Sequence, residues 1–267
     1  MYKSLYTLSN SIKYIYLIFI LILFISCSEE KSSKETLEIF AAASTQEILE
    51  EINISFSKEN NINIQMNLGG SNNLTSSIIR GATPDIIISA GELPIENIVN
   101  KGLIERENII SLWSNSLVII HHSNKEQKIS IKSILLNSKR IGIADPSLAP
   151  AGYYAKETLN QLINIQEIQK KLVYGTNVRT TLAHFATKHV DTALVYNSDA
   201  IAFSPKESTI IILPIPGSLT PPIIYSTGIL ESSQHKDIAN KYITYLKNNS
   251  SKILETKGFT PIKSTIE

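Results

Sequence analysis

The stretch from Leu37 to Glu59, LEIFAAASTQEILEEINISFSKE, contains a short apolar run, a turn of small residues and an amphipathic segment. Residues 37–42 have the composition of a short strand. The segment that follows carries apolar residues at four-residue spacing, namely Ile48, Ile52 and Phe56. That spacing puts these side chains on one face of a helix. The stretch therefore predicts a strand followed by a helix, the building unit of α/β proteins.

The start of this helix has its own sequence signal. Ser44 precedes the amphipathic segment at residues 45–59, and a serine in that position can cap a helix through its hydroxyl. Glu47 stands three residues after Ser44, which is the spacing of a capping box. We therefore expect Ser44 to be the N-cap and Glu47 to complete the capping box.

The same unit of strand, turn and helix recurs along the chain. Further strands are predicted at residues 62–68, 86–89, 140–144, 172–174, 192–196, 210–214 and 222–230. Further helices are predicted at residues 72–80, 153–163, 178–188 and 237–248. This alternation predicts two α/β lobes that face a cleft, because open α/β sheets bind ligands beyond the carboxyl ends of their strands.

Four of the predicted helix starts are built from small or uncharged residues. They are Ala41–Ser44 (AAAS), Gly69–Asn72 (GGSN), Ala149–Gly152 (APAG) and Thr176–Val178 (TNV). A helix start leaves backbone N–H groups free and carries a partial positive charge, and small residues let an anion approach them. Any one such turn is usually a plain cap, but several that converge predict a site for an ionised tetrahedral oxyanion without Lys or Arg.

The N-terminus has the pattern of a lipoprotein signal peptide, predicted over residues 1–27. An unbroken apolar run from Tyr14 to Ile25 is short for a membrane span but suits a signal-peptide core. Phe24–Cys27 (FISC) follows, and it resembles a bacterial lipobox, in which the cysteine carries lipid. Residues 28–36 are polar and predict a flexible tether. We therefore expect a protein anchored through Cys27 to a membrane and facing the periplasm or cell exterior.

Composition excludes several classes of protein. The 267 residues include 25 Lys plus Arg and 24 Asp plus Glu, so the chain lacks the basic field of a nucleic-acid binder. Cys27 is the single cysteine, which excludes a disulfide within the chain and a cysteine-rich metal site.

Seven motifs, spread from about Leu37 to Phe259, together resemble the periplasmic molybdate-binding protein family of ABC importers. The matching segments are Phe40–Ser44 (FAAAS), Gly69–Ser71 (GGS), Gly81–Ala90 (GATPDIIISA), Asp145–Glu157 (DPSLAPAGYYAKE), Asn177–Arg179 (NVR), Val195–Ala200 (VYNSDA) and Gly258–Phe259 (GF). The longest block, at residues 145–157, is the most specific. Three pairs depart from the family pattern. Thr45–Gln46 and Asn72–Asn73 follow the first and second motif serines, and His121–His122 end a strand where the family is usually apolar.

The resemblance implies a type II-like periplasmic binding protein fold with the ligand cleft between two lobes. Lobe 1 would comprise residues 37–115 and 226–267, and lobe 2 residues 116–225. The family's oxyanion ligands fall, by motif position, on Ser44, Ser71, Ala151, Val178 and Tyr196. The expected ligand is molybdate or tungstate, whose metal would have no direct protein ligand.

The resemblance also implies a monomeric binding protein, with no enzymatic activity and no cofactor, that delivers its ligand to an ABC permease. Arg179 follows Val178 directly and is the obvious rival source of anion binding. Residue 179 lies about 100° round the helix from residue 178, so we expect its side chain to face away and serve packing or lobe contacts.

Three alternatives remain open from the residues alone. The ligand could be sulfate, phosphate or another small anion. Two-lobed α/β folds also host deaminases and dehydratases, although an enzyme needs an acid, base or nucleophile and the cleft turns offer only Ser, Asn and Tyr. A surface lipoprotein that binds only a partner protein is the third alternative, and it would need no matching helix starts on both lobes.

Overall fold

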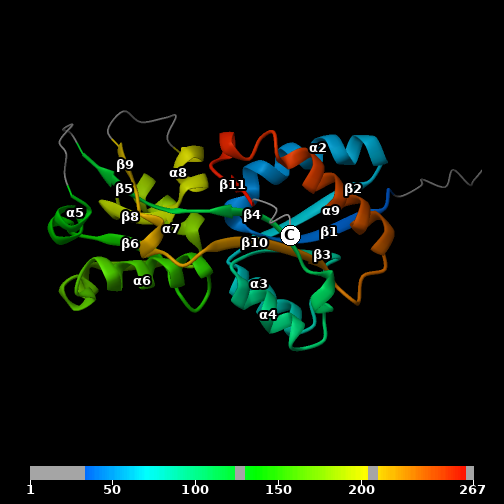
Figure 1. Cartoon of the computed structure of the whole chain (residues 1–267), viewed down its shortest axis with the longest axis horizontal. Helices are drawn as coiled ribbons and strands as arrows, with labels where there is room; N and C mark the ends of the chain where they lie inside the picture. The colour runs from blue at the N-terminus through cyan, green and yellow to red at the C-terminus, as the bar shows by residue number, and fades with distance from the viewer. Residues whose placement is uncertain (1–33, 124–129, 204–209, 263–267) are drawn as a thin grey trace, which may run out of the picture. The chain divides into compact units, whose positions relative to one another are not determined.

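The computed structural model describes residues 34–123, 130–203 and 210–262. The predicted signal peptide, Cys27 and most of the tether lie outside these residues. Residues from Thr36 onward form one unit, which contains two β-sheets with helices packed against them (Figure 1). None of the helices within the described ranges is long and apolar enough to cross a membrane.

Sheet A contains six strands in the order β11-β4-β10-β3-β1-β2. Their bounds are β1 Thr36–Ala42, β2 Asn63–Gly69, β3 Ile86–Ala90, β4 Ile110–Asn115, β10 Ile223–Ile229 and β11 Thr260–Pro261. β1 runs parallel to β2 and β3, whereas β10 is antiparallel to both of its neighbours. β10, which follows every strand of the second sheet in the chain, therefore lies in the interior of this sheet.

Sheet B contains five strands in the order β7-β6-β8-β5-β9. Their bounds are β5 Leu117–His122, β6 Ile141–Ala144, β7 Leu172–Gly175, β8 Thr192–Tyr196 and β9 Ile210–Pro214. β6 runs parallel to β7 and β8, and β5 is antiparallel to β8 and β9. The two sheets thus share one plan, a parallel part followed by an antiparallel strand.

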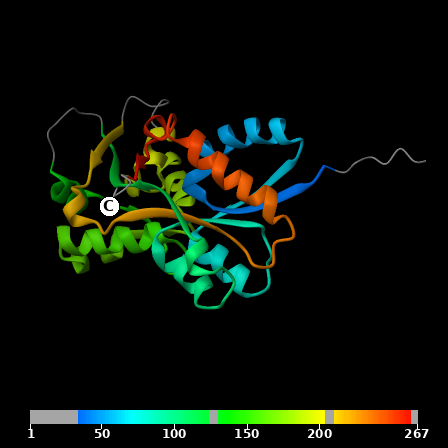
Figure 2. The same cartoon turned by 45° about the vertical axis from the view of Figure 1, so that its right-hand side comes forward.

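Helices cover both sheets. The α-helices are α2 Gln46–Asn60, α3 Ser71–Ile79, α4 Glu92–Val99, α5 Ile131–Asn137, α6 Pro150–Leu162, α7 Val178–Ala186, α8 Asn197–Phe203 and α9 Lys236–Ser250. The 3-10 helices are η1 Ala43–Thr45, η2 Arg106–Asn108, η3 Ile165–Glu167, η4 Gln169–Lys171, η6 Gly217–Leu219 and η7 Glu255–Lys257. On sheet A, α2 and α9 lie on one face and α3 and α4 on the other (Figure 2).

The register of the parallel strands decides where the helices begin. Ala42 at the end of β1 pairs with Gly69 at the end of β2. In sheet B, Ala144 at the end of β6 pairs with Gly175 at the end of β7. Because each pair of strands ends level, the loops and helices that follow start from one edge of each sheet.

The chain passes between the sheets at two places. Ser116 alone separates β4 of sheet A from β5 of sheet B, and residues 215–222 lead from β9 back to β10. The lobe boundaries that the family resemblance implies lie at residues 115/116 and 225/226. β10 spans residue 225/226, so the division into lobes at that point stays a proposal.

Several local predictions were incomplete or wrong. The helices α4, α5 and α8 and the strands β4 and β11 were not predicted from the sequence. α6 begins three residues before its predicted start, because Pro150 and Ala151 have the composition of a loop. The capping box is also wrong. Ser44 lies inside η1, α2 begins at Gln46, and Thr45 at its N-cap makes no side-chain capping bond.

Candidate ligand-binding cavity

A small cavity lies where the helix starts of sheet A and sheet B meet. Its free space is about 220 Å³, part of it open to solvent. The lining residues are Ala42, Ala43, Ser44, Gly69, Gly70, Ser71, Ala90, Ala149, Pro150, Ala151, Asn177, Val178 and Tyr196. All four small-residue turns contribute to this lining. The structure thus brings together the five residues predicted as oxyanion ligands, which come from elements far apart in the chain.

Ser71 contributes a hydroxyl from the first residue of α3. Its Oγ accepts a hydrogen bond from the backbone N–H of Ala90 at 3.0 Å. A hydroxyl has one proton to donate and can accept as well, so this bond uses the oxygen and leaves the proton available. Ser71 is buried and lines the cavity, so its remaining proton is available to a ligand bound there.

Ser44 contributes a second hydroxyl from η1. Its Oγ lies 2.7 Å from the phenol oxygen of Tyr225, a residue of β10 that is buried in the core. This long-range bond occupies the oxygen that a capping box would need, which is the physical reason why that prediction failed. Glu47 is also diverted, because its carboxylate pairs with Arg179 instead.

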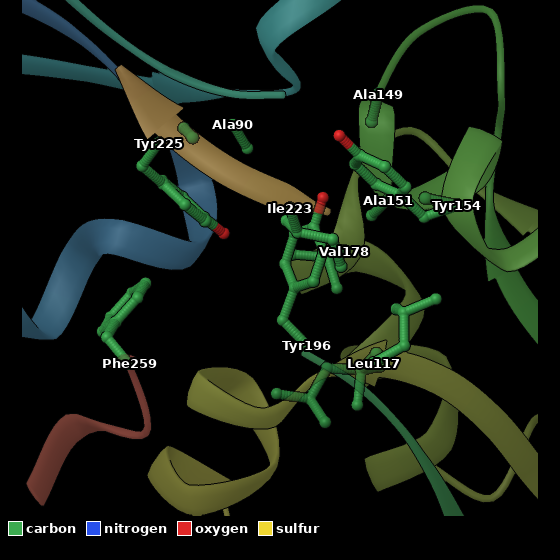
Figure 3. Close-up of a cluster of buried hydrophobic side chains, with 14 of the residues drawn as sticks. Ala90, Leu117, Ala149, Ala151, Tyr154, Val178, Tyr196, Ile223, Tyr225 and Phe259 are labelled. Atoms are coloured by element: carbon green, nitrogen blue, oxygen red, sulfur yellow. The ribbon is translucent and has the colours of Figure 1, made fainter. Parts of the chain in front are cut away.

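Tyr196 ends β8 and contributes a phenol. Its side chain is buried, and none of the described residues gives its hydroxyl a hydrogen-bond partner. Figure 3 shows Tyr196, Val178 and Ala151 near one another, and all three line the cavity. Burial raises the pKa of Tyr196 well above its ordinary value, so the phenol keeps its proton. A buried hydroxyl that lines a cavity and has no protein partner can donate a hydrogen bond to a ligand bound there.

Ala151 and Val178 contribute backbone N–H groups from the first turns of α6 and α7, where the helix itself has no carbonyl to offer. Asn177 caps α7 as expected, since its side-chain oxygen accepts the N–H of Thr180 at 3.0 Å. Gly152 has to be glycine, because a Cβ there would lie 2.2 Å from the carbonyl oxygen of Ala144. This close approach lets α6 start directly against β6.

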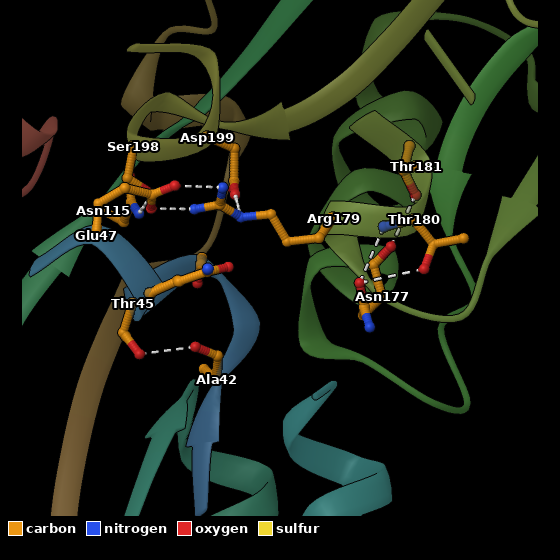
Figure 4. A network of polar contacts seen from close by, with 12 residues as sticks. Ala42, Thr45, Glu47, Asn115, Asn177, Arg179, Thr180, Thr181, Ser198 and Asp199 are labelled. Atoms are coloured by element: carbon orange, nitrogen blue, oxygen red, sulfur yellow. Dashed lines mark hydrogen bonds and ion pairs between the residues drawn. The ribbon is translucent and has the colours of Figure 1, made fainter. Parts of the chain in front are cut away.

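The cavity has no charged side chain among the described residues that line it. Arg179, next to Val178, extends from α7 toward Glu47 and Asp199 (Figure 4). Its Nη1 lies 2.6 Å from Glu47 Oε1, and its Nε lies 2.6 Å from Asp199 Oδ1. The expectation that Arg179 points away from the site is therefore confirmed.

Asp199 is fully buried in this ionic cluster. Burial raises the pKa of its carboxyl to about 7, and the neighbouring Arg179 guanidinium lowers it only in part. Glu47 belongs to α2 on sheet A, whereas Arg179 and Asp199 belong to α7 and α8 on sheet B. The cluster therefore joins the two sides of the molecule beside the cavity.

A second contact between the sides involves Asn72. Its side-chain amide reaches the carbonyl oxygens of Pro146 and Ser147, each at 3.3 Å. Beside it, a Cβ on Gly70 would lie only 2.4 Å from the carbonyl oxygen of Leu148. The departure from the family pattern at Asn72 thus adds a bond across the cleft and no further group to the cavity lining.

Two residues of this neighbourhood were missed by the sequence analysis. Tyr225 binds Ser44, and Asn115 at the end of β4 donates to Tyr225 at 3.3 Å. Neither lies in a recognisable motif or at an informative spacing from the predicted ligands. Among the described residues, no group of three or more His, Cys, Asp or Glu could hold a metal ion.

Comparison with known proteins defines the class. Residues 37–260 match the family model of bacterial extracellular solute-binding proteins. A Bacillus subtilis protein provisionally named ABC transporter substrate-binding lipoprotein YvgL is 34% identical over 241 residues, covering 88% of this chain and 92% of its own. The molybdate-binding protein ModA of Escherichia coli is 30% identical over 229 residues, covering 83% of this chain and 88% of its own.

A solved structure agrees with these relatives. The periplasmic molybdate-binding protein of Azotobacter vinelandii superposes with a TM-score of 0.75 at 21% identity, covering 85% of this chain and all of its own. This similarity shows the two-lobed α/β fold of periplasmic binding proteins. The chain belongs to the bacterial extracellular solute-binding protein family, and within it to the ModA-like substrate-binding proteins of ABC transporters, which are not enzymes.

Proposed function

We propose that this protein captures molybdate or tungstate in the cavity between its lobes and delivers it to a cognate ABC permease. The observation that carries the proposal is a cavity lined by neutral donors. Its hydroxyl donors are Ser44, Ser71 and Tyr196, and its backbone donors are the amides of Ala151 and Val178. Such a set suits a fully ionised tetrahedral oxyanion, because each donor can meet one of its oxygens.

The dimensions of the cavity support a small ligand. The free space of about 220 Å³ includes volume open to solvent, so the enclosed part of the cavity is smaller and suits a small ligand. Ala42, Ala43, Gly69 and Gly70 form part of the lining without long side chains, which lets an anion reach the helix starts. Two of the relatives described above are named for molybdate, which favours this oxyanion over sulfate.

The proposal includes the location and motion of the protein. We propose that residues 37–115 with 226–267 form one lobe, that residues 116–225 form the other, and that the lobes close on the ligand by hinge motion at the crossovers. Acylation of Cys27 would hold the monomer at the membrane. Replacing Cys27 with serine should abolish lipid labelling and membrane association; unchanged association would place the anchor elsewhere.

A ligand-dependent melting scan tests the proposed ligand. A protein that binds only when folded gains stability as RT ln(1 + [L]/Kd), about 4 kcal/mol at a thousandfold excess over Kd. We expect molybdate and tungstate to raise Tm clearly, and sulfate or phosphate at equal ionic strength to change it little. An equal response to sulfate would make the protein a sulfate binder, and no response to any of the four would refute an oxyanion ligand.

A further inference from the structure

We propose that Tyr225, held by Asn115, is a positioning residue that forces the Ser44 hydroxyl to donate into the cavity and so selects anions that carry no proton. This inference rests on the proposed function and explains why the Ser44 hydroxyl directs its proton to the ligand. Tyr225 does not line the cavity, so it acts through Ser44.

The direction follows from counting protons along a chain of three groups. Asn115 Nδ2 lies 3.3 Å from the Tyr225 phenol oxygen, and an amide nitrogen can only donate. Tyr225 therefore accepts from Asn115 and has its single proton left for Ser44 Oγ at 2.7 Å. Ser44 Oγ accepts this hydrogen bond from Tyr225, and the proton of Ser44 itself is directed to the cavity.

The orientation of the Asn115 amide fixes the whole chain. Its Oδ1 accepts the backbone N–H of Ser116 at 2.9 Å, and a backbone N–H can only donate. The other end of the amide is therefore the nitrogen, which also donates to Ser198 Oγ at 2.9 Å. A flipped amide would set its nitrogen against the Ser116 N–H, so the assignment is determined by chemistry.

Packing keeps Tyr225 in place. Its ring is buried. The centre of the Tyr225 ring lies 6.3 Å from that of Trp113, 5.4 Å from that of Phe259 and 6.1 Å from that of Tyr196. Burial raises its pKa far above the ordinary range, so the phenol remains protonated and can donate. The hydrogen bonds from Asn115 to Tyr225 and from Tyr225 to Ser44, which we call the relay, therefore keep one donor–acceptor direction.

The Ser71 hydroxyl is oriented in the same way by another donor, because its oxygen accepts a hydrogen bond from the Ala90 N–H. Each serine oxygen then already accepts one hydrogen bond from the protein, so each hydroxyl is oriented to donate its proton to the ligand. A molybdate or sulfate ion has acceptor oxygens alone and matches this arrangement. Hydrogen phosphate carries one O–H, which would be left without an acceptor, and an unmade hydrogen bond of a buried group is costly. With phenylalanine at position 225, the Ser44 hydroxyl could rotate and accept that proton.

The test compares the full-length protein with its Tyr225→Phe variant in detergent at pH 8. The Kd values of molybdate, sulfate and hydrogen phosphate are measured by calorimetry, with phosphate also in competition. We expect Tyr225→Phe to raise the Kd of the deprotonated anion that the wild type binds by about three- to tenfold. This change corresponds to the loss of one neutral hydrogen bond. The variant's preference for that anion over phosphate should fall by about tenfold or more.

Two further variants separate positioning from general damage. Tyr242→Phe removes an equally buried phenol that donates to Asn53 Oδ1 at 2.7 Å, away from the cavity, and should leave the anion preference unchanged. In a Ser44→Ala background, Tyr225→Phe should have no further effect on Kd. Equal weakening of all three anions, or full additivity with Ser44→Ala, would overturn the relay. Loss of oxyanion binding by the wild type would instead refute the proposed function.

Discussion

Helix α7 supplies two neighbouring regions that treat charge in opposite ways. Val178 belongs to the ligand cavity, which is lined by neutral donors. Arg179, the next residue, belongs to an ionic cluster with Glu47 and Asp199. Adjacent residues of one helix thus belong to two different sites. The cavity at Val178 accommodates the charge of a ligand, whereas the cluster at Arg179 pairs charges of the protein itself.

The difference shows why the nearest cation does not bind the anion. Arg179 already has two carboxylate partners, so the cluster carries a net negative charge whenever both are ionised. It would repel a second anion. The cavity relies on fixed dipoles instead, which need no counter-ion and do not change with pH while the hydroxyls stay protonated. Stability and ligand affinity are therefore separable, and variants can address each one alone.

Breaking the ionic cluster should have the largest effect, on stability. Arg179→Gln leaves the buried Asp199 carboxylate without its cation, which costs about 3–5 kcal/mol in the free energy of unfolding. Denaturant titration at pH 8, where Asp199 is ionised, measures this loss. Molybdate affinity of the same sample should change far less than in the serine variants. If Arg179→Gln abolishes binding while Ser44→Ala and Ser71→Ala keep wild-type affinity, the neutral-donor mechanism is wrong.

Removing a cavity hydroxyl should have the opposite pattern, a large loss of ligand affinity with a smaller loss of stability. A hydrogen bond to a charged partner contributes about 1.5–3 kcal/mol, so Ser44→Ala and Ser71→Ala should each weaken molybdate binding by about ten- to a hundredfold. Tyr196→Phe should do the same or somewhat less, as one donor among several. Titration calorimetry measures the affinities. A cooperative melting transition of each free variant is the control for folding, and its Tm should fall only by the loss of one buried hydrogen bond, to Tyr225 or to the Ala90 N–H.

The pH dependence of stability sharpens the comparison further. The pKa of Asp199 is about 7 in the folded protein and about 3.9 in an unfolded chain, so the folded state binds more protons in between. This carboxyl's contribution is fully present below pH 4 and is lost as the pH rises through 7. Asp199→Asn should remove that loss, so the wild type should lose Tm relative to the variant between pH 5 and pH 8. A constant difference between the two proteins would contradict the assignment.

The smallest effect is expected at the exposed end of the cluster. The Glu47 side chain is one-third exposed, and ion pairs of that kind contribute about 1 kcal/mol or less. Glu47→Gln should therefore lower the free energy of unfolding by no more than that amount in the ligand-free protein. Because Glu47 bridges the two lobes, any change in Kd should come from faster ligand release, which stopped-flow kinetics measures. A loss as large as that of Arg179→Gln would show that Glu47, and not Asp199, is the principal partner.

The sequence predicted those features that local pattern controls. The strand–turn–helix units and the cap at Asn177 follow from neighbouring residues, and the structure contains them. The five predicted ligands line one cavity because each closes a short motif at the end of a strand. Their part in binding stays a prediction until the variants are measured.

Long-range contacts account for what the sequence could not predict. The hydroxyl of Ser44 and the carboxylate of Glu47 have the spacing of a capping box, yet each bonds a residue more than a hundred positions away. Tyr225 had no signal of its own, because a tyrosine in a strand is ordinary. The start of α6 was misplaced at Pro150, since a proline suits a loop and the first turn of a helix equally well.

The position of β10 in sheet A has a consequence for the order of folding. β10 lies between β3 and β4, yet it is synthesised after every strand of sheet B. Sheet B can therefore assemble while sheet A still lacks its centre, and the lobe begun first is completed last. A chain that stopped before residue 223 would leave the edges of β3 and β4 without partners, and such open edges are templates for aggregation.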